Sequence, residues 1–371
     1  MNKTIIYLYI LSFCLFTVFT YFFIDPNFIY LKSLFTGFFQ NYRLITTVIY
    51  ATFIVILFFC YFEFIKQVGV APLNKLKPLI IIPMFGILAY PAALSFDIFN
   101  YVATAKVAFS YFENPYLIMP IEFLGDPVLL FTHAANKIAL YGPLWIIFTS
   151  LPHYLSFGNY LAALVLFKLF VAVFFFGTIW LIWRMTNNKY CVFYFAANPL
   201  VLIETFVGGH NDVVMMFFAL LSVYLLKNKK ILYAIIILIL SILIKYATIS
   251  LIPLFVYYFY QRIRHNEINW DKFYFLGFLL MLVIFFLSPI REELYPWYAI
   301  WPLTFLALVA DKKKIIALLF MVLSFSLMLR YIPFMLLGTY FGSTPLIRNI
   351  LTLVPVVLLM PVLLIKSKSL K

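Results

Sequence analysis

The sequence contains very little charge: only 11% of its 371 residues are Asp, Glu, Lys or Arg, and 66% are hydrophobic. A soluble domain carries about 25% charged residues. A soluble fold of this length could not cover its surface with so few charges, so we expect lipid to be the solvent. Lipid admits only helices and closed barrels. The apolar runs, such as residues 231–244, are continuous rather than alternating and therefore predict helices.

Several motifs are also missing. The three cysteines, Cys14, Cys60 and Cys191, lie inside apolar runs without CxxC or Cys/His spacing, which argues against disulfides and structural zinc. The sequence has no GxxxxGK[ST], so it encodes no nucleotide-driven pump, and it has no HExxH, which argues against an intramembrane zinc protease. The absence of an Arg-rich repeated helix excludes a voltage sensor.

Acidic residues are few, 13 against 27 Lys and Arg, and the net charge is +14. In a soluble protein this charge would suggest nucleic acid, but here Lys and Arg are expected to mark cytoplasmic loops, and no nucleic-acid partner is expected. Placing the basic clusters inside predicts about 11–13 transmembrane helices with both termini in the cytoplasm. The first apolar run, residues 4–24, is interpreted as an uncleaved anchor. We therefore predict one all-α domain over residues 1–371 in the plasma membrane.

The longest predicted outer loop spans residues 96–158. Its segment 141–157 is apolar enough to cross the membrane, but counting it as a span would violate the charge rule, so we expect a juxtamembrane or re-entrant helix. Long loops in compact proteins are usually functional. The short runs 231–244 and 246–260 predict a hairpin whose tip, Lys245, lies within the outer half of the membrane.

Asp97 directly follows an apolar run at the start of this loop, at the expected boundary between membrane and water. A partly desolvated carboxylate in that position suits a general base. The structural alternative is an aspartate that caps the N-terminus of a helix.

A second polar group joins two hydrophobic passes through almost no loop. The glycines of the turn 208–212 permit a tight bend that projects His210, Asn211 and Asp212 from the mouth of the bundle. Glu204 lies inside an apolar run, where an acidic residue is a functional hypothesis by default. Two alternatives stay open: Asn211 or Asp212 caps the next helix, or Glu204 pairs with a cation such as Lys245 or Lys168.

A third group, which includes Arg291, Tyr295 and Trp297, precedes the apolar run 297–310. Its aromatic residues could form an interfacial belt. Arg291 and Lys245 are the outer cations best placed to meet an anionic head group, whereas Arg330 and Arg348 could simply anchor at the interface. Because the acids gather on one face rather than through the depth of the bundle, the pattern favours a one-sided active site over a transport path.

Taken in order, these motifs resemble those of a known family. The matching motifs are Asp97-x-x-Asn100-Tyr101-x-Ala103, Asn114-Pro115-Tyr116, Gly125-Asp126-Pro127, Tyr141-Gly142-Pro143-Leu144, Asn198-Pro199-Leu200, Gly209-His210-Asn211-Asp212-x-x-Met215, Lys245-Tyr246 and Pro296-Trp297-Tyr298. Their order resembles that of GT-C superfamily polyprenyl-phosphate-mannose-dependent mannosyltransferases, nearest to the bacterial α-(1→6)-mannopyranosyltransferases. The resemblance covers residues 78–302, and residues 303–371 are expected to form C-terminal transmembrane helices. The chain is shorter than typical members.

The resemblance implies a GT-C-type glycosyltransferase that moves a hexose, expected to be mannose, from a polyprenyl-phosphate donor to a glycan or lipid-linked acceptor on the outer face. Asp97 would take the acceptor proton in an inverting displacement, and Lys245 and Arg291 would meet the phosphate. The predicted donor- and acceptor-binding residues are His210, Asn211, Asp212, Glu204, Lys245, Arg291, Tyr101, Lys106, Tyr141, Tyr295 and Trp297. No nucleotide sugar is bound directly, and a divalent cation, which Asp212 could help hold, is compatible but not required.

Two other hypotheses compete with this one. A transporter or flippase of a lipid-linked sugar would use the same outer acids to bind a head group, but it would also need polar residues in the inner half of the bundle. Lys168 is the main unassigned charge there. A structural subunit of a larger complex would neither transfer nor transport a sugar.

Overall fold

The computed structural model describes residues 3–32, 34–69, 78–290 and 293–368, and these residues form helices and no strand. The all-α class is therefore confirmed. Six helical segments are long and apolar enough to cross a membrane: Thr4–Phe23, Arg43–Val68, Tyr160–Thr186, Trp270–Ile290, Lys314–Leu337 and Thr344–Pro361. They identify an integral membrane protein that crosses the bilayer several times.

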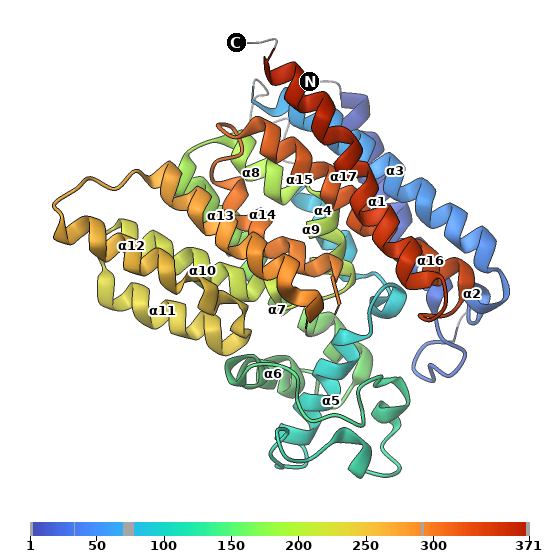
Figure 1. Cartoon of the computed structure of the whole chain (residues 1–371). Helices are drawn as coiled ribbons and strands as arrows, with labels where there is room; N and C mark the ends of the chain where they lie inside the picture. The colour runs from blue at the N-terminus through green and yellow to red at the C-terminus, as the bar shows by residue number, and fades with distance from the viewer. Residues whose placement is uncertain (1–2, 33, 70–77, 291–292, 369–371) are drawn as a thin grey trace.

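The longest helices carry these spans (Figure 1). They are α1 (Lys3–Phe19), α3 (Arg43–Val68), α7 (Tyr160–Thr186), α13 (Trp270–Leu287), α15 (Lys314–Leu329) with α16 (Tyr331–Leu337), and α17 (Thr344–Lys368). The other helices are α2 (Phe38–Asn41), α4 (Pro78–Ile87), α5 (Asp97–Phe109), α6 (Pro143–Leu155), α8 (Lys189–Ala196), α9 (Pro199–Leu202), α10 (Asp212–Lys227), α11 (Ile231–Ile244), α12 (Ile252–Ile263) and α14 (Ile300–Ala307). Short 3₁₀ turns and one π-helical turn, Ile203–Val207, link several of them.

Fewer helices reach membrane length than the 11–13 predicted, because several apolar runs fold as short helices. The 14 residues of α11 extend about 21 Å, against about 30 Å for the hydrocarbon core. The predicted hairpin is present: α11 ends at Ile244, Lys245 is extended, and the chain returns through the 3₁₀ turn Tyr246–Leu251 into α12.

One further candidate span is broken. Helix α8 and the segment Pro199–Val207 together would cross a membrane, but they meet at an angle of 53°. The break lies at Asn198-Pro199, where proline has no N–H to donate and the Asn198 side chain instead accepts from the N–H of Leu200 at 3.0 Å.

The break leaves carbonyl groups that tyrosines of neighbouring helices satisfy. The N–H groups of Ala197 and Asn198 bond to Phe193 and Phe195, so the carbonyl of Tyr194 is bypassed. The Tyr61 hydroxyl donates to this carbonyl at 2.6 Å. The Tyr9 hydroxyl likewise donates to the carbonyl of Ala197 at 2.6 Å. Without water to replace them, such bonds are required inside a membrane.

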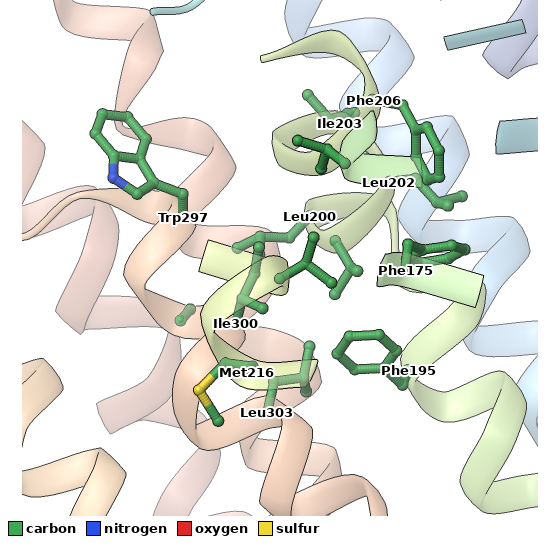
Figure 2. Close-up of a cluster of buried hydrophobic side chains, with 14 of the residues drawn as sticks. Phe175, Phe195, Leu200, Leu202, Ile203, Phe206, Met216, Trp297, Ile300 and Leu303 are labelled. Carbon is green, nitrogen blue, oxygen red and sulfur yellow. The ribbon is translucent and has the colours of Figure 1, made fainter. Parts of the chain in front are cut away.

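The side chains of the broken segment are buried in the core. Figure 2 shows Leu200 and Phe206 among side chains of the surrounding helices, including Phe175 of α7, Met216 of α10 and Leu303 of α14. All five side chains are fully buried, and the rings of Phe175 and Phe206 meet edge to face at 4.8 Å. This packing fixes the π-helical turn that carries Glu204.

Helices α5 and α6 stand at the end of the bundle opposite the start of α1 and the end of α17 (Figure 1). Helix α6 has only 13 residues, and segment 110–142 between the two helices contains short 3₁₀ turns, Pro120–Glu122 and Pro127–Phe131. The long predicted loop is therefore an ordered cap that begins with Asp97.

We expect Tyr61→Phe to lower the free energy of unfolding by about 1–3 kcal/mol, because the buried carbonyl of Tyr194 then loses its donor while the ring is kept. Thermal unfolding of the purified protein in detergent measures the change. Tyr7→Phe is the matched control, since Tyr7 is 63% exposed. Equal unfolding temperatures for the two variants would contradict the role given to Tyr61.

Candidate active site

Asp97 is the first residue of α5, and its carboxylate does not cap that helix. Phe96 occupies the N-cap position, and no side-chain cap hydrogen bond is present. The backbone N–H of Asp97 donates to Ser95 Oγ at 3.2 Å. The Asp97 side chain is 30% exposed and faces His210. The capping alternative is therefore wrong, although the helix N-terminus still favours the negative charge of Asp97.

The turn before α10 needs both of its glycines. Gly209 has a φ of +71°, which favours glycine, and a Cβ there would lie 2.9 Å from the side chain of Ile98. A Cβ on Gly208 would lie 2.7 Å from the His210 ring. The backbone N–H of His210 donates to the carbonyl of Glu204 at 3.1 Å. The turn therefore folds back tightly and directs the His210 side chain toward Asp97.

His210 is fully buried between two carboxylates. Its Nδ1 lies 3.4 Å from Asp97 Oδ2, and its Nε2 lies 3.3 Å from Glu204 Oε2. These are ion-pair distances, longer than ordinary hydrogen bonds. The ring of Trp297 stacks on the imidazole at 4.0 Å, and Tyr295 stacks on Trp297 at 4.4 Å. The structure thus brings together five of the residues predicted for the site.

The electrostatic setting keeps His210 positively charged. Burial by itself would lower the pKa of the imidazole, but the contacts with Asp97 and Glu204 outweigh it and raise the pKa to about 9. At neutral pH the ring is therefore an imidazolium between two carboxylates. Its proton is lost only as the pH rises through about 9.

Glu204 has a second partner that the sequence did not reveal. The hydroxyl of Tyr331, the first residue of α16, donates to Glu204 Oε1 at 2.9 Å. The alternative pairing with a lysine is wrong: Lys245 bonds to Asp212, and Lys168 donates to the carbonyl of Ala89 at 2.5 Å, beside the C-terminal end of α4. A cation at the end of a helix is stabilised by the helix dipole.

Asp212 and Lys245 form the second charged part of the site. Asp212 Oδ1 accepts from Lys245 Nζ at 2.9 Å and from Trp301 Nε1 at 2.6 Å. The Lys245 ammonium also lies 4.3 Å from the centre of the Tyr298 ring. Asp212 is fully buried, whereas the Lys245 side chain is 25% exposed. The Lys245 ammonium is therefore held in place and partly exposed at the surface.

Neither Asn211 nor Asp212 caps α10 through its side chain. Asn211 occupies the N-cap position and makes no side-chain cap hydrogen bond. Its backbone N–H donates instead to the Tyr101 hydroxyl at 3.4 Å, and the Tyr101 ring meets Tyr141 edge to face. The described residues contain no group of three or more His, Cys, Asp and Glu that could hold a metal ion. The charge beside Asp212 is that of Lys245.

Lys106 lies on the opposite face of α5 from Asp97, nine residues along the helix. Its Nζ is 2.6 Å from Asp126 Oδ2, and the Tyr111 hydroxyl donates to the same oxygen. Burial opposes ionisation of Asp126, but the hydrogen bonds from Lys106 and Tyr111 outweigh it and lower the pKa of this carboxyl. This pair fixes the fold of segment 110–142.

The C-terminal helices make contacts that the sequence did not predict. Arg330 and Arg348 are not interfacial anchors: their side chains are 2% and 8% exposed and lie 2.9 and 2.8 Å from Glu293 Oε1. Arg330 also donates to Thr352 Oγ1 at 2.8 Å. The position of these arginines inside apolar runs was the one signal in the sequence for such ion pairs, because a buried charge requires a partner. Arg291 lies outside the described residues.

Gly142 brings the cap and the hairpin tip into backbone contact. Its N–H donates to the carbonyl of Ile244 at 3.1 Å. A Cβ on Gly142 would lie 2.2 Å from the carbonyl oxygen of Leu243 and 2.7 Å from that of Ile244. The φ of Gly142 is −68°, so space rather than conformation requires glycine. This contact sets the position of the adjacent Lys245.

A family model described as alpha-(1->6)-mannopyranosyltransferase, N-terminal domain, matches residues 25–261. The match covers more than half of the chain and includes Asp97, His210 and Lys245, but it ends before Trp297 and Tyr331. No match is found among the curated proteins or among the solved structures.

We expect Gly142→Ala to lower the free energy of unfolding by about 1–3 kcal/mol, because two backbone segments must separate to admit the methyl group. Thermal unfolding in detergent measures this. Gly69→Ala is the control, since a Cβ there meets no atom within 4 Å. A Gly142→Ala protein as stable as the control would show that the two segments are not in contact.

Proposed function

The chain belongs to the α-(1→6)-mannopyranosyltransferase family and is a glycosyltransferase of the mannosyltransferase type, and we propose that its donor is a hexose, most simply mannose, linked through phosphate to a polyprenol. The acceptor is a hydroxyl of a glycan or of a lipid-linked sugar. The observation that carries this proposal is the presence of two partly exposed charges around one turn: Asp97 contacts His210, and Lys245 pairs with Asp212 two residues further on.

Asp97 acts as the general base of an inverting displacement. The acceptor O–H bond breaks and its proton goes to the Asp97 carboxylate, while the acceptor oxygen forms a bond to the anomeric carbon. The bond from that carbon to the phosphate oxygen breaks, and the electron pair leaves with the phosphate. A β-linked donor therefore gives an α-glycoside. A carboxylate that is 30% exposed can reach a hydroxyl group in this way.

Lys245 meets the negative charge that develops on the leaving phosphate. Asp212, Trp301 and Tyr298 hold its ammonium group from the buried side, and the exposed side faces the donor. A cation fixed in advance needs no reorganisation during the reaction, which is the basis of electrostatic catalysis. Arg291 remains a predicted second cation.

His210 is a positioning residue rather than a base, because its imidazolium is fully buried and already carries its proton. It holds Asp97 through Nδ1 while Glu204 and Trp297 fix its own ring. A general base that is oriented by a charged partner loses less entropy when the acceptor binds.

We place the site on the outer face of the membrane, with both termini in the cytoplasm. Helices α5 and α6 lie at the end of the bundle opposite the start of α1 and the end of α17 (Figure 1), which supports this orientation. A lipid-linked donor would then present its sugar outside, so no nucleotide sugar is required.

The competing transporter hypothesis requires polar residues in the inner half of the bundle, where Lys168 was its main candidate. Lys168, the unassigned charge within a span, is 1% exposed and donates to the carbonyls of Ala89 and Gly86. A lysine fixed at a helix end does not provide a step along a polar path.

We expect Asp97→Asn to fold normally and to lower the rate of hexose transfer by about two to four orders of magnitude, because an amide cannot take up the acceptor proton. The assay incubates purified protein with labelled polyprenyl-phosphate-mannose and an α-(1→6)-mannoside acceptor. Asp271→Asn, which changes an exposed carboxylate paired with Lys312, is the control and should keep full activity. Near-full activity of Asp97→Asn would remove the mechanism, and movement of intact lipid without product would favour the transporter.

A further inference from the structure

A polar groove lies between α5, Pro120 and segment 132–141. Its empty volume is about 230 Å³, including the solvent at its mouth. Its polar lining comes from Asn100, Thr104, Thr132, Lys137 and Tyr141. Pro120 and Ile138 contribute apolar surface, and no carboxylate lines the groove. The lining therefore combines hydrogen-bonding groups with apolar side chains.

Two side-chain atoms in this groove, Asn100 Nδ2 and Thr104 Oγ1, have no hydrogen-bond partner among the described residues. Asn100 is 9% exposed and its Oδ1 accepts from the N–H of Ala134 at 3.5 Å, but its Nδ2 donates no hydrogen bond there. Thr104 is 7% exposed, and its Oγ1 likewise has no hydrogen bond within the described part of the chain. Both atoms remain open to the groove rather than sealed in the core. Polar groups that are nearly buried and unpaired are suited to bind a polar ligand.

The groove continues from the catalytic face of α5. Asn100 and Thr104 follow Asp97 by three and seven residues, so both lie within about a sixth of a turn of it around the helix. Thr104 is about 10 Å from Asp97 along the helix axis. A ligand in the groove would therefore extend from the general base along α5.

We infer that this groove is a subsite for the acceptor, which binds the sugar residues next to the one that is glycosylated. The inference rests on the proposed function and names the class of its acceptor: a neutral oligosaccharide. Sugar hydroxyls both donate and accept, so they can pair with the Asn100 amide, the Thr104 hydroxyl and the Lys137 ammonium. The apolar faces of the sugar rings fit Pro120 and Ile138.

The test is equilibrium binding of α-(1→6)-linked mannotriose to the purified protein without donor, so that binding is measured apart from catalysis. We expect Thr104→Val, which keeps the shape and removes the hydroxyl, to weaken binding about tenfold. Lys137→Ala, at an exposed position, should weaken it in the same direction. Thr149→Val is the control, because Thr149 is 1% exposed on α6 and donates to Ile146.

Unchanged affinity in both groove variants would overturn the subsite, as would wild-type protein that does not bind mannotriose. Thermal unfolding confirms that each variant is folded before its affinity is compared. A wild type that binds mannotriose with the expected pattern but transfers no hexose supports the subsite and contradicts the proposed function, so the two failures are distinct.

Discussion

The imidazole of His210 is fully buried, and the carboxylates of Asp97 and Glu204 lie on either side of it. A buried charge is stable only if its partners are also held, and removal of one partner from such a group costs about 3–5 kcal/mol. Asp97 and Glu204 therefore fix His210, and the imidazolium in turn fixes both carboxylates. The stability of this arrangement is fully present below the ordinary histidine pKa and is lost as the pH rises through about 9.

Three separate parts of the chain meet at this ring: α5 with Asp97, residues 203–212 with Glu204 and His210 itself, and the segment with Trp297. Gly209 allows the turn that carries His210, and the packed π-helical turn carries Glu204. The two arginines of the C-terminal helices hold Glu293, close in sequence to the stacked Trp297. The turn 208–212, the π-helical turn and α5 all lie within the matched family region, whereas Trp297 and Tyr331 lie beyond it, so residues outside the family match complete the site.

Features that depend on local patterns could be predicted from the sequence. Composition indicated an all-α membrane protein, and the polar residues after apolar runs identified Asp97, the turn at 210–212 and the hairpin tip at Lys245. The number of full-length spans could not be predicted, because the break at Asn198-Pro199 depends on tyrosine donors from other helices. Contacts between residues far apart in the sequence could not be predicted either: Tyr331, which donates to Glu204, lies 127 residues from it.

The protonation state of His210 tests this arrangement most directly. Nitrogen-15 NMR of the labelled imidazole, assigned by comparison with His210→Gln, reports whether both ring nitrogens carry a proton. We expect a doubly protonated ring at pH 7 that titrates near pH 9. A neutral ring at pH 7, with a midpoint at or below the ordinary histidine value of about 6.5, would contradict the paired carboxylates.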